Sequence, residues 1–214
     1  MENQMFTLLA PTKFRLAATA LTLGIVGIAN ADEVRLAGNT KGAFDAQAFG
    51  NTNNLLNLSY SNSTFDNTTV GGLLNFGGDP TPGTNFNNLG SFTIGTVDAV
   101  YTGHTFKLQV NFTAPSTIVG GNSSVFTSVL SGTLSNGLGG VFVDFDNTPQ
   151  TFFFTNGASS GSFTFTVNDT SLAPSSSASI TAHISGAQSV PEASSLAGIT
   201  AGMLGLFGMI RRRK

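Results

Sequence analysis

Residues 106–113 read FKLQVNFT, a stretch in which every second side chain is apolar. Successive side chains of an extended strand point to opposite faces, so this period places one set in a core and the other in water. The apolar set is Phe106, Leu108, Val110 and Phe112. Residues 163–168 and 180–185 repeat the alternation. All three stretches therefore predict half-buried antiparallel strands.

Weaker strand patterns surround these three, and chain-breaking residues separate them. They cover residues 55–60, 69–76, 90–97, 125–134, 141–145 and 151–155. Glycine and asparagine between them, as at Asn136 and Gly137, supply the positive backbone angles that tight turns require. The pattern predicts an all-β fold, specifically an antiparallel β-sandwich of jelly-roll or immunoglobulin-like type. A β-solenoid is the alternative, although the sequence has no consistent repeat length.

Phenylalanine supplies much of the predicted core, since sixteen of the nineteen lie between residues 32 and 189. The run TFFF at residues 151–154 breaks the alternation. We expect a central strand buried on both faces there, the alternative being one ring exposed as a contact site. Residues 32–54 are rich in glycine and asparagine. They are expected to form a loose leader with at most one edge strand, which leaves residues 55–189 as the β-sandwich domain.

Composition excludes several functional classes. The chain has no cysteine, so it has no disulfide scaffold, thiol nucleophile or thiolate metal site. Residues 32–189 contain nine acidic and three basic side chains, a formal charge of −6. A nucleic-acid partner is not expected, because the basic patch that binds phosphate is missing from the sequence. Serine, threonine, asparagine and glycine supply the polarity instead.

One serine motif resembles a catalytic signature. Residues 157–161 read GASSG, and Ser159 is followed along the chain by Asp169 and His183. A nucleophile elbow needs a sharp strand-to-helix turn, whereas this segment joins two alternating strands. We therefore interpret the match as chance, and no enzymatic activity is expected.

The best metal-binding candidate is a pair of carboxylates, Asp144 and Asp146, at the end of a predicted strand. Calcium takes six to eight oxygen ligands, so this pair alone is a weak candidate. The preferred interpretation is a solvent-facing strand edge that runs into a turn. His104 and His183 are likewise interpreted as polar strand residues. No metal and no cofactor are expected.

The N-terminus has the order of parts found in a secretory signal peptide. Lys13 and Arg15 precede an apolar run at residues 16–28, and Ala29 and Ala31 form a small-x-small cleavage site. We predict a signal peptide over residues 1–31, cut after Ala31. The alternative is an uncleaved membrane helix or a buried helix, for which the apolar run is short.

The C-terminus, residues 190–214, carries a second predicted targeting signal. It consists of a Val-Pro-Glu motif, fifteen largely apolar residues at 196–210 and a basic end. The motif residues are Val190, Pro191 and Glu192, with Ala193 after them, and the basic residues are Arg211, Arg212, Arg213 and Lys214. Such a span is expected to enter a bilayer as a short transmembrane helix and to stop with its cations on the cytoplasmic side.

This arrangement resembles the PEP-CTERM sorting signal of bacteria, with Ala193 where that signal has its second proline. The resemblance is limited to the C-terminal signal. It implies recognition by an exosortase after secretion, a transient inner-membrane intermediate, and a final place at the cell surface or outside the cell. It also implies an association with extracellular polysaccharide and biofilm.

Taken together, the residues predict a non-enzymatic exported surface or matrix protein. Its expected partners are the secretion machinery, an exosortase, the inner membrane and extracellular polysaccharide. The alternative is a carbohydrate- or calcium-dependent binding or adhesion module on the same sandwich.

Overall fold

The computed structural model describes residues 33–77, 87–157 and 159–191. These residues form antiparallel β-strands and turns, with no helix among them, which confirms the predicted all-β class. Accordingly, no helix that could cross a membrane occurs within those three ranges. The expected signal helix over residues 1–31 and the expected span over residues 196–210 lie outside them.

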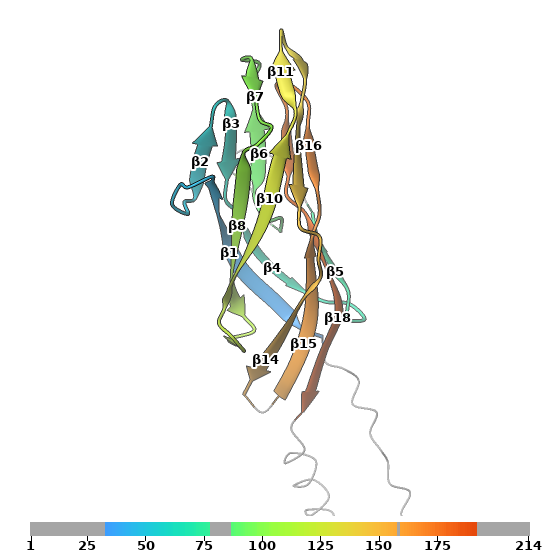
Figure 1. The fold of residues 1–214 in the computed structure, drawn as a ribbon. Coiled ribbons are helices and arrows are strands. Elements are labelled where there is room, and N and C mark those ends of the chain that lie inside the picture. Colours follow the sequence, from blue (N-terminus) through green and yellow to red (C-terminus); the bar gives the residue numbers. More distant parts are fainter. Residues whose placement is uncertain (1–32, 78–86, 158, 192–214) are drawn as a thin grey trace, which may run out of the picture.

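A long six-stranded sheet forms one layer of the fold (Figure 1). Its order is β16-β13-β10-β8-β1-β4. The strands are β1 (Arg35–Phe44), β4 (Thr64–Thr68), β8 (Thr105–Ala114), β10 (Ser123–Ser131), β13 (Val141–Phe145) and β16 (Thr170–Leu172).

Three smaller sheets complete the fold. The five-stranded sheet has the order β5 (Leu74–Phe76), β18 (Ala182–Pro191), β15 (Ser159–Val167), β14 (Gln150–Asn156) and β9 (Thr117–Ile118). The four-stranded sheet has the order β17 (Ser177–Ser179), β6 (Ser91–Ile94), β3 (Leu58–Ser61) and β2 (Thr52–Leu55). A three-stranded sheet of β12 (Leu138–Gly139), β11 (Thr133–Ser135) and β7 (Ala99–Val100) lies at the upper end in Figure 1.

The inner face of β8 joins the long sheet to both of the larger covering sheets. Its alternation is as predicted, since all four apolar side chains are buried. The Phe106 ring lies 4.8 Å from Phe92 of the four-stranded sheet, centroid to centroid. At the other end of β8, the Phe112 ring lies 5.5 Å from Phe163 of the five-stranded sheet. Two sheets therefore pack against one longer sheet, an arrangement compatible with the predicted β-sandwich.

The prediction of a loose leader over residues 32–54 is wrong. Residues 35–44 form β1, a ten-residue strand between β8 and β4 in the long sheet, and not an edge strand. The glycines that suggested flexibility lie where rings approach the backbone. A Cβ on Gly38 would lie 2.6 Å from the Phe65 ring, and one on Gly42 would lie 2.5 Å from the Tyr60 ring. These glycines therefore make room for the aromatic core.

Two predicted strands in fact contain turns that reverse the chain. Residues 55–60 contain the turn between β2 and β3, where Leu56 adopts a φ of 56°. Residues 69–76 contain the turn between β4 and β5, where Gly71 and Gly72 have positive φ. Runs of apolar residues across both turns hid the reversal, because hydrophobic periodicity alone does not report a change of strand direction.

The phenylalanine run at residues 151–154 also differs from its preferred interpretation. Phe154 is buried and Phe152 stacks on Phe163 at 5.2 Å, but Phe153 is 59% exposed. The alternative, one exposed ring, is thus the observed arrangement. Its reason is that β14 belongs to a sheet covered on one face, so alternate side chains of the strand point to solvent.

We predict that Gly42→Ala destabilises the fold. The added methyl group would press on the buried rings of Tyr60 and Phe106, which have no free space to enter. Overpacking of this kind costs about 1–3 kcal/mol, which corresponds to several degrees of Tm. Thermal unfolding of the full-length chain in detergent, followed by circular dichroism, measures the loss. Gly95→Ala is the matched control, because its Cβ would meet its nearest atom at 3.6 Å; equal Tm values for the two variants would contradict the packing argument.

Candidate functional site

The chain enters and leaves the fold in its lower part as drawn in Figure 1, which we call the anchor pole. At the entry, the Val34 amide donates to Thr69 Oγ1 over 3.0 Å. Thr69 Oγ1 in turn donates to one Glu33 carboxylate oxygen over 3.1 Å, and the Gly71 amide donates to the other over 3.0 Å. The first described residues are therefore held to the β4–β5 turn from the start.

The exit is strand β18, which contains part of the predicted sorting motif. Val190 pairs with Ser160 of β15, and Pro191 pairs with Ser159. The predicted domain boundary after residue 189 is thus wrong by two residues, because the sheet continues through Pro191. Glu192, the span and the basic residues from Arg211 to Lys214 lie outside the described part of the chain, as do Ala29 and Ala31.

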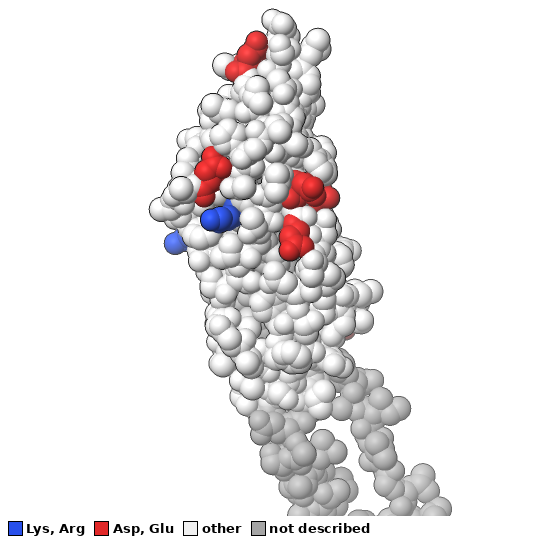
Figure 2. Space-filling model, viewed as in Figure 1, with Lys and Arg blue, Asp and Glu red and all other residues white. Residues whose placement is uncertain are grey.

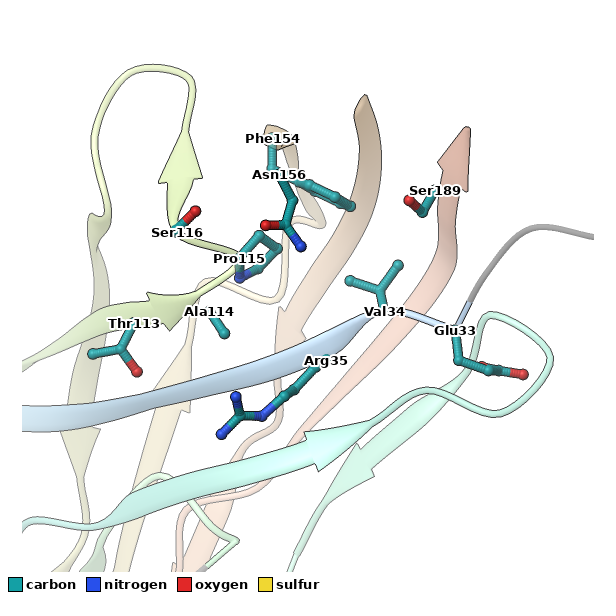
Figure 3. Close-up of a pocket in the computed structure, with 10 residues that line it drawn as sticks. All are labelled: Glu33, Val34, Arg35, Thr113, Ala114, Pro115, Ser116, Phe154, Asn156 and Ser189. Atoms are coloured by element: carbon teal, nitrogen blue, oxygen red, sulfur yellow. The ribbon is translucent and has the colours of Figure 1, made fainter. Parts of the chain in front are cut away.

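A pocket of about 280 Å³ opens between the two layers at the anchor pole (Figure 3). Its walls include Val34 just before β1, Arg35 of β1, Pro115 and Ser116 after β8, Asn156 of β14 and Ser189 of β18. Arg35 is committed to an ion pair, with its Nε 2.8 Å and its Nη2 2.6 Å from the Asp66 carboxylate oxygens. Hydrogen bonding from Arg35 lowers the pKa of Asp66. The pocket therefore presents mainly amide, hydroxyl and apolar groups.

The outer face of the five-stranded sheet is rich in hydroxyl groups and carries no formal charge. Its strands contain no Asp, Glu, Lys or Arg. The exposed or half-exposed positions include Thr151, Phe153 and Thr155 of β14, Ser160, Ser162 and Thr164 of β15, and Gln188 and Val190 of β18. Thr151 and Thr164 lie 3.2 Å apart, hydroxyl to hydroxyl. Such a face can accept and donate hydrogen bonds but has no ionic contacts to offer.

Of the two carboxylates considered for calcium, Asp146 holds a turn and Asp144 is a solvent-facing strand residue. Asp146 Oδ1 accepts a hydrogen bond from the Thr148 amide at 3.0 Å, and bonds from Thr148 lower the pKa of Asp146. Asp144 is exposed on β13, opposite Val129 of β10. Across the ranges that the structure describes, no three His, Cys, Asp or Glu side chains group in a way that could hold a metal ion.

The serine, aspartate and histidine of the elbow pattern are not brought together. Ser159 begins β15, whereas His183 pairs with Thr166 near its other end. Seven residues of strand separate the two positions, which is about 23 Å. Asp169 accepts hydrogen bonds from the Phe145 amide at 2.9 Å and from Asn147 at 3.2 Å. The segment is a hairpin between antiparallel strands, as its alternating flanks predicted.

His104 has a partner that the sequence did not reveal. Its Nδ1 lies 2.8 Å from Asp45 Oδ2, and the other carboxylate oxygen accepts a 2.8 Å hydrogen bond from the Thr105 amide. The Thr105 bond, supported by His104, lowers the pKa of Asp45. Asp45 and His104 are 59 residues apart in the chain, so no local spacing could have indicated the pair.

We predict that Asp45→Asn lowers stability at neutral pH by about 1 kcal/mol, a modest value because the pair is partly exposed. Since the folded pKa lies below the unfolded one, the carboxylate stabilises the fold above about pH 4. This stabilisation is lost as the pH falls through the folded pKa. Urea unfolding from pH 7 to pH 2 should therefore show the variant and the wild type converging in acid. Asp144→Asn is the control, and a constant difference between Asp45→Asn and the wild type at every pH would refute the linkage.

No protein-family model, curated protein or solved structure matches this chain. Its function is therefore inferred from its own residues and geometry.

Proposed function

We propose that the protein is a non-enzymatic, exported cell-surface or extracellular-matrix protein. A signal peptide over residues 1–31 delivers it, and an exosortase processes it through the PEP-CTERM-like signal at residues 190–214. The part that is delivered is a β-sandwich of jelly-roll or immunoglobulin-like type, flanked in the precursor by the signal helix and the short transmembrane helix.

One observation supports this proposal most directly. The described strands begin and end close to the two predicted processing sites. Glu33 is already bound by Thr69 and Gly71 two residues after the predicted signal cleavage at Ala31. At the other end, the sheet finishes at Pro191, inside the sorting motif. Removal of both targeting segments would therefore leave every described strand intact except β18, which would lose at most its last two residues, Val190 and Pro191.

The surface supports an extracellular role near polysaccharide. The five-stranded sheet presents hydroxyl and amide groups without formal charge, which suits contact with a neutral, hydrated polymer. The alternative, a carbohydrate- or calcium-dependent adhesion module, has this same face in its favour. Its calcium-dependent form has less support, because Asp146 and Asp169 are engaged in turn and strand-end hydrogen bonds.

The processing step is tested by changing Pro191 and Glu192 together to alanine. We expect the unprocessed precursor to accumulate in the inner membrane, because the exosortase would lose its recognition motif. Cell fractionation and intact-mass analysis measure this. Normal surface release of the double variant would refute exosortase processing, and a purely cytoplasmic wild-type protein would refute export itself.

A second prediction follows from the pairing of the motif with β15. A protease that acts near Val190 and Pro191 must first detach the end of β18, since strand pairing hides the backbone. The double variant Ser160→Cys and Val190→Cys places two thiols at paired positions of neighbouring strands. In the oxidising compartment we expect a disulfide that blocks processing, with release restored by a reductant. The two single variants are the controls, and unimpaired processing of the oxidised double variant would show that detachment is not required.

A further inference from the structure

Three large apolar side chains are exposed on the five-stranded sheet at the anchor pole. Phe153 is 59% exposed, Val119 is 67% exposed and Val190 is 51% exposed. We call these three residues the apolar patch. Val119, which follows β9, and Phe153 are neighbours, because the Val119 amide donates to the Phe153 carbonyl at 2.8 Å. Val190 lies on the same face two strands away, on β18. Phe153 pairs with Ser162, whose other partner is Gln188, two residues before Val190.

The patch lies in the part of the surface that is free of formal charge. In Figure 2 the charged side chains of the viewed face gather over its upper part. The lower part, where β14, β15 and β18 lie in Figure 1, is almost uniformly white. This segregation matters because acidic side chains are repelled by an anionic lipid surface, whereas an uncharged face is not. The acidic domain thus presents a neutral face on β14, β15 and β18, whereas the charged Glu33, Arg35 and Asp66 lie on or beside β1 and β4 of the long sheet.

The chain outside the structure limits how far this end can lie from a membrane. Only four residues, 192–195, separate Pro191 from the predicted span at residues 196–210. A fully extended chain advances at most about 3.6 Å per residue, so the tether reaches about 18 Å. A ten-residue strand is itself about 33 Å long. With the span inserted, the anchor pole and not the opposite end must therefore lie next to the bilayer.

We propose that the apolar patch docks on the outer surface of the inner membrane while the precursor is anchored. The inference rests on the proposed function, because it needs the C-terminal span in the bilayer. Phe153 would enter the boundary between headgroups and acyl chains, a depth that aromatic rings favour. The surrounding threonine and serine hydroxyls would face the lipid headgroups.

Tethering makes this weak contact effective. Three side chains bury little area, so the free domain would not stay on a membrane by itself. The tether keeps the domain close to the membrane, so the effective concentration of the docking site is high. The docked state is then populated although the contact itself is weak. Once the tail is removed, the same domain leaves the surface. The patch would thus hold the sorting motif at the interface before cleavage without retaining the product afterwards.

The test uses the absence of tryptophan from the chain. Phe153→Trp introduces a unique fluorophore at an exposed position, and the full-length variant is reconstituted into vesicles that contain phospholipids brominated near the headgroup end of their chains. We expect a blue-shifted emission and a loss of intensity relative to vesicles of unbrominated lipid. Phe142→Trp is the matched control, since Phe142 is also exposed but lies on β13 of the long sheet. Its emission should not change.

A third variant separates this inference from the proposed function. Phe207→Trp lies in the predicted span and reports whether the tail inserts. Quenching at positions 207 and 153, without quenching at 142, supports docking. Quenching at 207 alone leaves the anchor in place and overturns docking. Absence of quenching at 207 overturns the anchor and docking together. A shift of the Phe153→Trp emission by a neutral polysaccharide, with no response to brominated lipid, would also overturn docking and assign the patch to glycan binding.

Discussion

The packing of β8 against two sheets is the interaction on which the rest of the structure depends. Its inner side chains form one continuous row, with Phe106 against Phe92 at one end and Phe112 against Phe163 at the other. Each covering sheet alone is too short to bury the row. The long sheet therefore needs both, and the positions of β3, β6, β14 and β15 follow from that need. Gly42 of β1 completes the arrangement because it lets the Phe106 ring approach the backbone.

Period-two alternation was sufficient to predict the strands that contribute most to this core, β8 and β15, and to predict the all-β class. It failed for β1, where Gly38 and Gly42 occupy inward positions between Leu36 and Phe44 and interrupt the apolar alternation. Alternation cannot indicate which of three consecutive phenylalanines faces the core. Only the structure shows that Phe153 is the exposed one. The pair of Asp45 and His104 is likewise a product of tertiary folding. The residues of the predicted sorting motif gave no indication that Val190 and Pro191 also form the end of a strand.

The charged groups mostly serve local structure. Arg35 joins β1 to Asp66 of β4, Glu33 holds the β4–β5 turn, and Asp146 and Asp169 accept backbone hydrogen bonds beside β13. The side chains that could have carried acid–base or metal chemistry are thus largely engaged in the fold. The sheet that contains the end of the chain is left neutral.

The position of Pro191 is compatible with both a stable sheet and the proposed cleavage of the tail. Proline has no amide hydrogen and cannot donate a hydrogen bond to a neighbouring strand, so it is tolerated where a strand ends. Pro191 is the last residue of β18. Its partner, Ser159, is the first residue of β15. One residue of the motif can therefore serve as the end of the fold and the start of the recognised segment.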